Sequence, residues 1–326
     1  MMEPDRGECR AEPWHPNTRE TADAHGHRAQ AIALEQRAGA DEILTACLAE
    51  AVEAFGWAGA GFGLRRRLLG VWLREPVQRV AALLQACDRL AALDGLRRAG
   101  AYAVGELAAQ VQVSGRHRLP VNGPLLLVSN HPGLADAVAL FAQLPRNDLK
   151  VIAAPRPLLT ALPGLARHLL LLHDRPAART AVVRQAVRHL RGGGSLLCYP
   201  GGCIEPDPAC GSQADAALSH WSASIDTFAR RVPGLTIVPV AVSGVVSPSA
   251  RAHPLTRLRR RPAGRAWLAA TLQMLRRQPA DVRVQVAFGR PIHRAAWPAG
   301  HSARADVLEE MQRLFTRQRR PAAARP

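Results

Sequence analysis

The sequence predicts an α/β protein in which a mixed, largely parallel sheet is covered by helices on both faces and preceded by an N-terminal helical segment. Three observations support this fold class. From residue 111 onward, short apolar runs alternate with stretches of helical periodicity. The connections between them are short, as in repeated strand-helix units. The chain has 326 residues, of which 48% are hydrophobic, so it can bury a large core.

Composition and periodicity divide the chain into four segments. Residues 1–27 lack periodicity and are rich in Pro, charged residues and His, so we expect a disordered tail. Residues 28–104 are expected to form a helical, basic, amphipathic segment. Residues 105–295 are expected to form the α/β domain, and residues 296–326 a last helix followed by a second disordered tail.

The basic segment begins with Ala-rich helical stretches over residues 29–55 and a glycine-rich joint over residues 56–63. It continues with LRRRLLGVWLREP over residues 64–76, where arginines accompany Leu, Val and Trp. This composition is typical of a helix in the interface of an anionic bilayer. A helix that packs on the core and exposes its arginines has the same pattern, so both interpretations stay open. No run of about 18 apolar residues occurs, so we expect only peripheral membrane contact.

Strand and helix signals alternate through the α/β segment. Strands are expected at residues 111–115, 125–128, 150–154, 195–200, 236–242 and 282–288, with a further apolar run from Leu169. Helices are expected at residues 134–144, 180–191, 219–232 and 303–317, and one more contains Pro163-Gly164. A long loop over residues 201–215 follows the strand at residues 195–200.

His131 is the first candidate functional residue, because it closely follows the apolar strand at residues 125–128. Pro132 and Gly133 end the extended chain, and a helix is expected from residue 134. His131 should therefore lie between the C-terminal end of a strand and the N-terminus of a helix. In open α/β sheets, this is the edge where ligands bind.

Asp136 follows His131 by five residues, in the first turn of the expected helix. From there its carboxylate can accept a hydrogen bond from one imidazole nitrogen and leave the other free to take a proton. A histidine that caps the helix beside an unrelated aspartate would show the same spacing. The sequence has no G-x-S-x-G nucleophile elbow, so covalent catalysis by a serine is not indicated.

The chain carries a net charge of +17 and has a pI of about 11.3, so its surface should attract nucleic acid, an anionic membrane or a polyphosphate ligand. The RLRRR run at residues 257–261 favours nucleic acid. However, no known binding module is present, and Tyr and Phe are few for base stacking, so no nucleic-acid partner is expected. The six cysteines form no C-x-x-C pair and no signal peptide precedes them. Reduced thiols in the cytoplasm and no metal site are therefore expected.

Several further blocks follow one another in a characteristic order. They are V-x-V-x-G at residues 111–115, LPVNGPLLLVSNHPGLAD at 119–136, Arg156 before PLLTALPGL, HDR at 173–175, YPGG at 199–202, VPVAVSG at 238–244 and FGRPI at 288–292. In this order and spacing the chain resembles the glycerolipid acyltransferase family, whose founding members acylate lysophosphatidic acid and glycerol 3-phosphate. The resemblance covers about residues 111–293, and N-H-x-x-x-x-D after a strand is its most specific block.

The resemblance implies an O-acyltransferase without a bound cofactor, in which acyl-CoA or acyl-carrier protein is the donor and a glycerolipid is the acceptor. His131 would be the general base that deprotonates the acceptor hydroxyl, and Asp136 would orient it. The amides of Gly201 and Gly202 would donate to the oxyanion or hold the acceptor. The substrate-binding residues implied in this way are Arg156, Arg175, Tyr199, Gly201, Gly202 and Glu205. The expected location is cytoplasmic, peripheral on the inner face of the cell membrane and in contact with anionic lipid.

The third block departs from the family pattern, which commonly has F-P-E-G. This chain has Tyr-Pro-Gly-Gly at residues 199–202, and its nearest acid is Glu205. A P-G-G-x-x-E block is similar to that of acyltransferases for neutral acceptors such as monoacylglycerol or diacylglycerol. Arg175 favours a phosphorylated acceptor, so 1-acyl-glycerol-3-phosphate stays first and a neutral acceptor is the alternative. A non-catalytic lipid-binding protein is a further alternative, which the intact His131 and Asp136 disfavour.

Overall fold

The computed structural model describes residues 39–57, 63–133, 135–276, 281–293 and 300–319, apart from the side chains of residues 64–66. The expected N-terminal tail at residues 1–27 and the tail after residue 319 lie outside the described residues, as does most of the expected joint at 56–63. By its internal contacts the chain divides into residues 1–41 and residues 42–326. The second unit contains the sheet and every candidate site residue.

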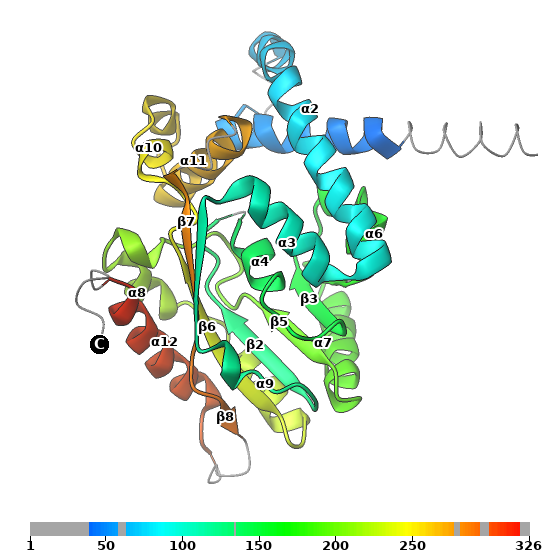
Figure 1. Cartoon of the computed structure of the whole chain (residues 1–326), viewed down its shortest axis with the longest axis vertical. Helices are drawn as coiled ribbons and strands as arrows, with labels where there is room; N and C mark the ends of the chain where they lie inside the picture. Colours follow the sequence, from blue (N-terminus) through cyan, green and yellow to red (C-terminus); the bar gives the residue numbers. More distant parts are fainter. Residues whose placement is uncertain (1–38, 58–62, 134, 277–280, 294–299, 320–326) are drawn as a thin grey trace, which may run out of the picture. The chain divides into compact units, whose positions relative to one another are not determined.

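An eight-stranded sheet forms the centre of this unit (Figure 1). Its strands are β1 (Gln110–Ser114), β2 (Leu125–Ser129), β3 (Leu149–Ala153), β4 (Leu169–Leu171), β5 (Ser195–Cys198), β6 (Thr236–Ser243), β7 (Arg283–Phe288) and β8 (Ile292–His293). The order is β1-β7-β6-β2-β5-β3-β4, and β8 also pairs with β6. From β6 to β4 all neighbours are parallel, whereas β7 and β8 are antiparallel to β6. The predicted mixed, largely parallel sheet is confirmed.

Helices cover both faces of the sheet, as predicted (Figure 1). One face carries α3 (Leu96–Leu107) and α4 (Ala135–Phe141), and the other carries α7 (Pro176–Arg191), α9 (Ser224–Arg231) and α12 (Ala303–Arg319). The central strand β2 shows why its sequence is apolar at successive positions. Leu125 and Leu127 pack into the first core, between the sheet and the helices α3 and α4. Leu126 and Val128 pack into the second core, between the sheet and the helices α7, α9 and α12. Because successive side chains of a strand point to opposite faces, a strand covered on both sides needs this continuous apolar run.

A third core connects helical residues 42–55 with α2 (Gly63–Asp94) and α11 (Pro262–Arg276). The helix α2 continues through Pro76 without a break. Its residues Leu69, Leu73 and Val77 are buried, whereas Leu68, Val71 and Trp72 are exposed. One face of this helix therefore packs on the core, and the other face is exposed. No described helix has the length and apolar character needed to cross a membrane.

Two regions differ from the sequence-based expectation. The helix α11 was not predicted, although Leu268, Leu272 and Leu275 form its buried side. The single helix expected at residues 219–232 is wrong, because the chain forms α8 (Gln213–Leu218) and α9 with a turn between them. That turn contains Trp221, which is 2% exposed, so the helix is interrupted where this indole enters the core. The remaining short helices are α5 (Pro157–Thr160), α6 (Pro163–Ala166), α10 (Pro248–Arg251), η2 (Arg116–Arg118), η3 (Pro208–Cys210) and η4 (Pro254–Leu258).

Candidate active site

The carboxyl ends of the parallel strands meet at one edge of the sheet, which is the ligand-binding edge of open α/β folds. Each predicted site residue follows one of these strand ends in the chain. His131 comes after β2, Tyr199 after β5, Arg156 after β3 and Arg175 after β4. Since β2 and β5 are direct neighbours, the loops that follow them begin side by side.

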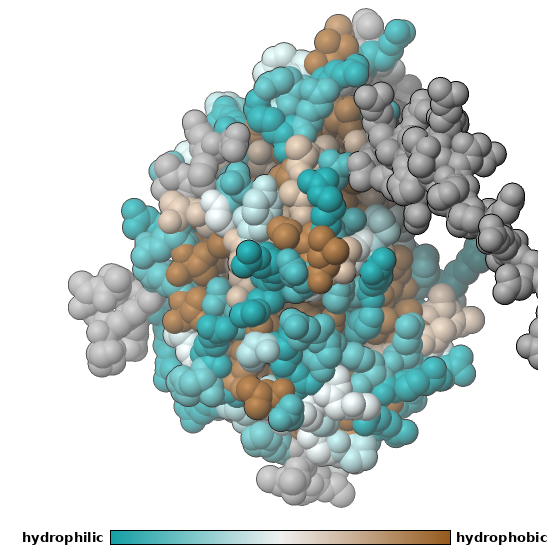
Figure 2. All heavy atoms as spheres, turned by 45° about the vertical axis from the view of Figure 1, so that its right-hand side comes forward, coloured by the Kyte–Doolittle hydropathy of each residue, from teal (hydrophilic) through white to brown (hydrophobic). Residues whose placement is uncertain are grey.

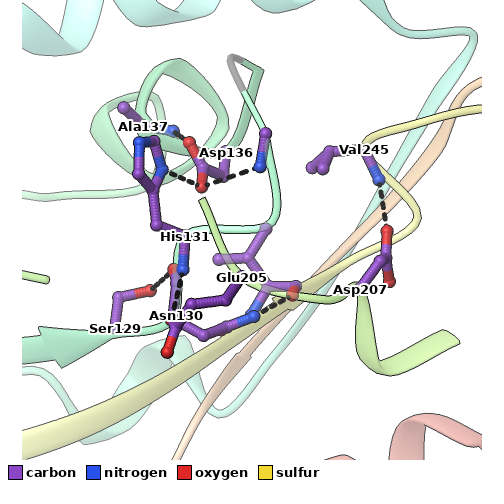
Figure 3. Close-up of polar contacts among 10 residues, drawn as sticks. Ser129, Asn130, His131, Asp136, Ala137, Glu205, Asp207 and Val245 are labelled. Carbon is purple, nitrogen blue, oxygen red and sulfur yellow. Dashed lines mark hydrogen bonds and ion pairs between the residues drawn. The ribbon is translucent and has the colours of Figure 1, made fainter. Parts of the chain in front are cut away.

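His131 and Asp136 form the hydrogen-bonded pair that their spacing predicts (Figure 3). The imidazole Nδ1 lies 2.6 Å from Asp136 Oδ2. Asp136 is fully buried, and its other oxygen accepts the amide of Ala137 at 2.5 Å. A carboxylate accepts a hydrogen bond from Nδ1–H, so the preferred tautomer leaves Nε2 free to take a proton. The imidazole is 27% exposed, which leaves it accessible to a bound hydroxyl group.

Opposing effects shift the pKa of His131. Burial lowers the pKa. The charge and hydrogen bond of Asp136 and the charge of Glu205 raise it by more than burial lowers it, so the net shift is upward from 6.5. A general base must be unprotonated to act. The site is therefore expected to work on the alkaline side of this raised pKa.

Asn130 fixes the chain immediately before His131. Its side-chain amide donates to the Val242 carbonyl and its oxygen accepts the Val242 amide, both at 2.8 Å. Asn130 is 1% exposed and extends the hydrogen-bond ladder between β2 and β6 by one step. The sequence interpretation gave Asn130 no role of its own. The sequence feature that could have indicated such a role is a polar residue directly after an apolar strand.

Glu205 holds the backbone of His131 from the neighbouring loop (Figure 3). Its Oε2 accepts the His131 amide at 3.0 Å, and its own amide donates to the His131 carbonyl at 2.8 Å. Its Oε1 accepts the indole N–H of Trp221 at 2.6 Å. Glu205 is only 5% exposed. The resemblance implied that Glu205 binds substrate, whereas the structure places its carboxylate inside the protein with both oxygens engaged.

Asp207 fixes the same loop to the end of β6 and was not predicted. Its Oδ2 accepts the amides of Gly244 at 2.8 Å and Val245 at 3.2 Å, and its Oδ1 accepts the amide of Ala209 at 2.9 Å. Asp207 is 7% exposed. The loop after β5 is therefore attached to the chain at the end of β2 through Glu205 and to the chain at the end of β6 through Asp207. Across the described residues, no cluster of three His, Cys, Asp or Glu side chains is arranged to hold a metal ion.

Tyr199 packs its ring against that of His131, with centroids 4.7 Å apart and planes at 33°. Its hydroxyl is buried without a hydrogen-bond partner in the described part of the chain, and burial raises its pKa well above 10. The amide of Gly202 donates to the Tyr199 carbonyl at 3.1 Å and closes a turn. The Gly202 amide is therefore engaged within the protein. The amide of Gly201 remains the candidate of the pair.

The two arginines differ in their surroundings. Arg156 lies 3.2 Å from Glu53 and 3.4 Å from Glu50, and its guanidinium stacks 5.1 Å from the ring centre of Trp267. A substrate phosphate would have to compete with these two carboxylates for Arg156. Arg175 is exposed, immediately before α7, and no ion pair engages it within the described residues.

Comparison with known proteins finds a similarity in the part of the chain that forms this site. The model of the Acyltransferase family matches residues 110–243. This part of the chain is therefore similar to an acyltransferase domain. Among solved structures, the chain is similar to the 1-acyl-sn-glycerophosphate (LPA) acyltransferase PlsC from Thermotoga maritima, with 15% identity over 77% of this chain and 84% of that chain and a TM-score of 0.41. No curated protein matched the chain.

The match over residues 110–243 supports the enzyme class, an acyltransferase, that the sequence resemblance implies. The matched range begins with β1 and ends with β6, so it contains the whole strand edge described above. His131, Asp136 and Glu205 all lie inside it.

Proposed function

We propose that this acyltransferase moves a fatty acyl group from acyl-CoA or acyl-carrier protein to a hydroxyl group of a glycerolipid. The first candidate for this acceptor is 1-acyl-glycerol-3-phosphate. The observation that carries the proposal is the 2.6 Å hydrogen bond between His131 Nδ1 and Asp136. It supports an imidazole whose Nε2 takes the proton of an acceptor hydroxyl.

In the proposed reaction the acyl group passes directly from thioester to ester. The acceptor oxygen attacks the thioester carbonyl carbon while its proton moves to His131 Nε2, and Asp136 stabilises the imidazolium. The amide of Gly201 donates to the negative oxygen of the tetrahedral intermediate. The intermediate then collapses, the C–S bond breaks, and the thiolate takes the proton from His131. The products are the new ester and a free thiol, and the histidine is neutral again.

Arg175 supports a phosphorylated acceptor. It follows β4, and β4 lies three strands from β2, which is about 14 Å at the usual strand spacing. An acceptor lying across the carboxyl edge would bring its phosphate toward this exposed guanidinium, while its hydroxyl meets His131. Arginine binds phosphate through charge-assisted, often bidentate hydrogen bonds.

A neutral acceptor is the second candidate, and the surroundings of Glu205 favour it. Where the family more often has a Glu, this chain has Gly201, and the acid that follows, Glu205, is engaged by His131 and Trp221. Monoacylglycerol or diacylglycerol would need no phosphate ligand. The two candidates differ in whether Arg175 matters.

Acyl transfer to a panel of acceptors tests the proposal. Purified protein with labelled acyl-CoA is expected to acylate 1-acyl-glycerol-3-phosphate. Arg175→Ala should raise the KM for this acceptor about 10- to 10²-fold with little change in kcat, because a hydrogen bond to a charged group contributes about 1.5–3 kcal/mol. Arg184→Ala, an exposed arginine on α7, is the matched control. Transfer only to monoacylglycerol or diacylglycerol would establish the second candidate, and transfer to no acceptor would end the proposal.

The N-terminal half of α2 supports the proposed peripheral contact with an anionic membrane. Leu68, Val71 and Trp72 are 63%, 77% and 68% exposed, and Arg67 and Arg74 are exposed on the same part of the helix. Figure 2 shows hydrophobic side chains at the top of the view, where Figure 1 places this end of α2. Exposed aromatic and aliphatic side chains beside arginines suit a lipid interface with anionic headgroups.

Vesicle co-sedimentation tests this surface. Replacing Leu68, Val71 and Trp72 by Ser is expected to weaken binding to anionic vesicles at least about 10-fold, since burying one large apolar side chain contributes about 1.5–3 kcal/mol. Val121→Ser is the control, because Val121 is also 68% exposed but precedes β2. Binding that ignores both the triple substitution and the lipid charge would contradict the contact.

A further inference from the structure

The backbone of His131 is held by a carboxylate 74 residues further along the chain. Glu205 and His131 exchange two contacts: the His131 amide donates to Glu205 Oε2 at 3.0 Å, and the Glu205 amide donates to the His131 carbonyl at 2.8 Å. Such a reciprocal pair fixes both the distance and the direction of the two chains. A shift of the Glu205 side chain would therefore move the backbone that carries the imidazole.

The second oxygen of Glu205 is fixed by Trp221. The indole N–H donates to Oε1 at 2.6 Å, and Trp221 is itself 2% exposed in the core beside α9. The Ser222 amide next to it donates to the Pro200 carbonyl at 3.1 Å, which attaches the same turn to the start of the β5 loop. Glu205 thus connects a rigid indole on one side with the His131 backbone on the other.

Gly201 leaves room for the Glu205 carboxylate because it has no side chain. A Cβ added at Gly201 would lie 2.5 Å from Glu205 Oε1 and 2.8 Å from its Cδ. Any larger residue at position 201 would push the carboxylate away from Trp221. The P-G-G-x-x-E pattern therefore has a physical explanation, because the first Gly makes room for the Glu four residues later.

We propose that Glu205 is a positioning residue, which together with Trp221 holds His131 in the orientation needed for acyl transfer and does not bind the acceptor. This inference rests on the proposed role of His131 as the base. It replaces an acceptor-binding role for the acid of this loop with an internal one. The chemistry stays with His131 and Asp136, and Glu205 acts through the backbone and through its charge.

Glu205 also acts on the imidazole electrostatically. The charged or titratable groups that face His131 are Asp136 from α4, Glu205 from the loop after β5, and Tyr199 at the end of β5. Burial lowers the pKa of His131, and the charges of Asp136 and Glu205 raise it. Removing the charge of Glu205 should lower this pKa, whereas removing a remote acceptor ligand should leave it unchanged.

The test combines kinetics with an NMR titration of the imidazole. Glu205→Gln keeps the side-chain volume but replaces one acceptor oxygen by an NH2 group and removes the charge. We expect kcat to fall about 10- to 10²-fold, as for a small displacement of a catalytic group. The KM for both substrates should be unchanged, and the acid limb of the pH profile should move to lower pH. The NMR pKa of His131, assigned with His131→Ala, should fall as well, and this readout does not depend on turnover.

A second pair of substitutions addresses the connection itself. Trp221→Phe should lower kcat in the same way, because Oε1 loses its donor. Gly201→Ala should lower kcat in the wild-type background but add no further loss to Glu205→Ala, since the displaced group is then absent. Glu309→Gln, on the exposed face of α12, is the control and should change neither kcat nor the His131 pKa.

Three outcomes would overturn the inference. They are a raised acceptor KM with kcat and the pH limb unchanged in Glu205→Gln, an unchanged His131 pKa, and additive losses from Gly201→Ala and Glu205→Ala. Failure of the proposed function has a different signature. In that case the wild type transfers no acyl group, whereas the NMR pKa of His131 still falls in Glu205→Gln.

Discussion

His131→Ala is expected to lower kcat for acyl transfer about 10²- to 10⁴-fold, the usual contribution of a positioned general base. The imidazole is held by the fully buried Asp136. Without it, the acceptor hydroxyl must lose its proton to water as it attacks the thioester. The measurement is the rate of ester formation with labelled acyl-CoA at saturating acceptor.

His117→Ala is the matched control, because His117 is exposed in the short turn after β1. Its rate should equal that of the wild type. Equal rates for wild type and His131→Ala would show that this histidine is not the base and would remove the proposed mechanism.

The pH dependence of kcat/KM reports on the same pair of residues. The wild-type rate is expected to rise with pH through a pKa above 6.5, since Asp136 and Glu205 outweigh the lowering by burial and the unprotonated ring is the active form. Asp136→Asn removes the largest upward effect, so the acid limb should move to lower pH. The plateau rate should fall too, because the ring tautomer is held less firmly. A limb at the same pH in both proteins would mean that Asp136 does not act on His131 in solution.

Asn130→Ala is expected to lower the free energy of unfolding by about 2–5 kcal/mol, because it leaves the amide and carbonyl of Val242 buried without partners, each at a cost of about 1–3 kcal/mol. Chemical denaturation measures this change. The rate of acyl transfer should fall as well, since residue 130 directly precedes His131. Asn130→Asp should also be less stable than the wild type, because a carboxylate cannot donate to the Val242 carbonyl.

Asn122→Ala supplies the comparison, since Asn122 is exposed in the turn before β2. Its free energy of unfolding should stay within about 0.5 kcal/mol of the wild type, as for most surface substitutions. If both variants lose equally little, the side-chain bridge between β2 and β6 does not contribute to stability.

The local parts of the site were predictable from the sequence. The apolar run Leu125–Val128, the turn at Pro132-Gly133 and Asp136 in the next helical turn lie within one strand-turn-helix unit. Spacing along such a unit determines which side chains meet, so the hydrogen bond of His131 with Asp136 followed from it. The fold class followed in the same way, because a strand buried on both faces must be apolar throughout.

Contacts between distant segments were decided only by the tertiary structure. The resemblance implied substrate-binding roles for Glu205 and Arg156, but it could not show which groups of the protein surround their side chains. The fold places Trp221 and the His131 backbone against Glu205, and Glu50 and Glu53 against Arg156.

The amphipathic helix α2 shows both levels in one element. Its sequence determined that it is helical, basic and apolar on more than one side. It did not determine which apolar residues are covered, since that depends on whether another helix packs there. The structure buries Leu73 in the third core and leaves Trp72 exposed. The sequence by itself therefore determined the fold class and the pairing of His131 with Asp136, which depend on local patterns. The partners of the remaining charged and apolar groups depend on long-range packing.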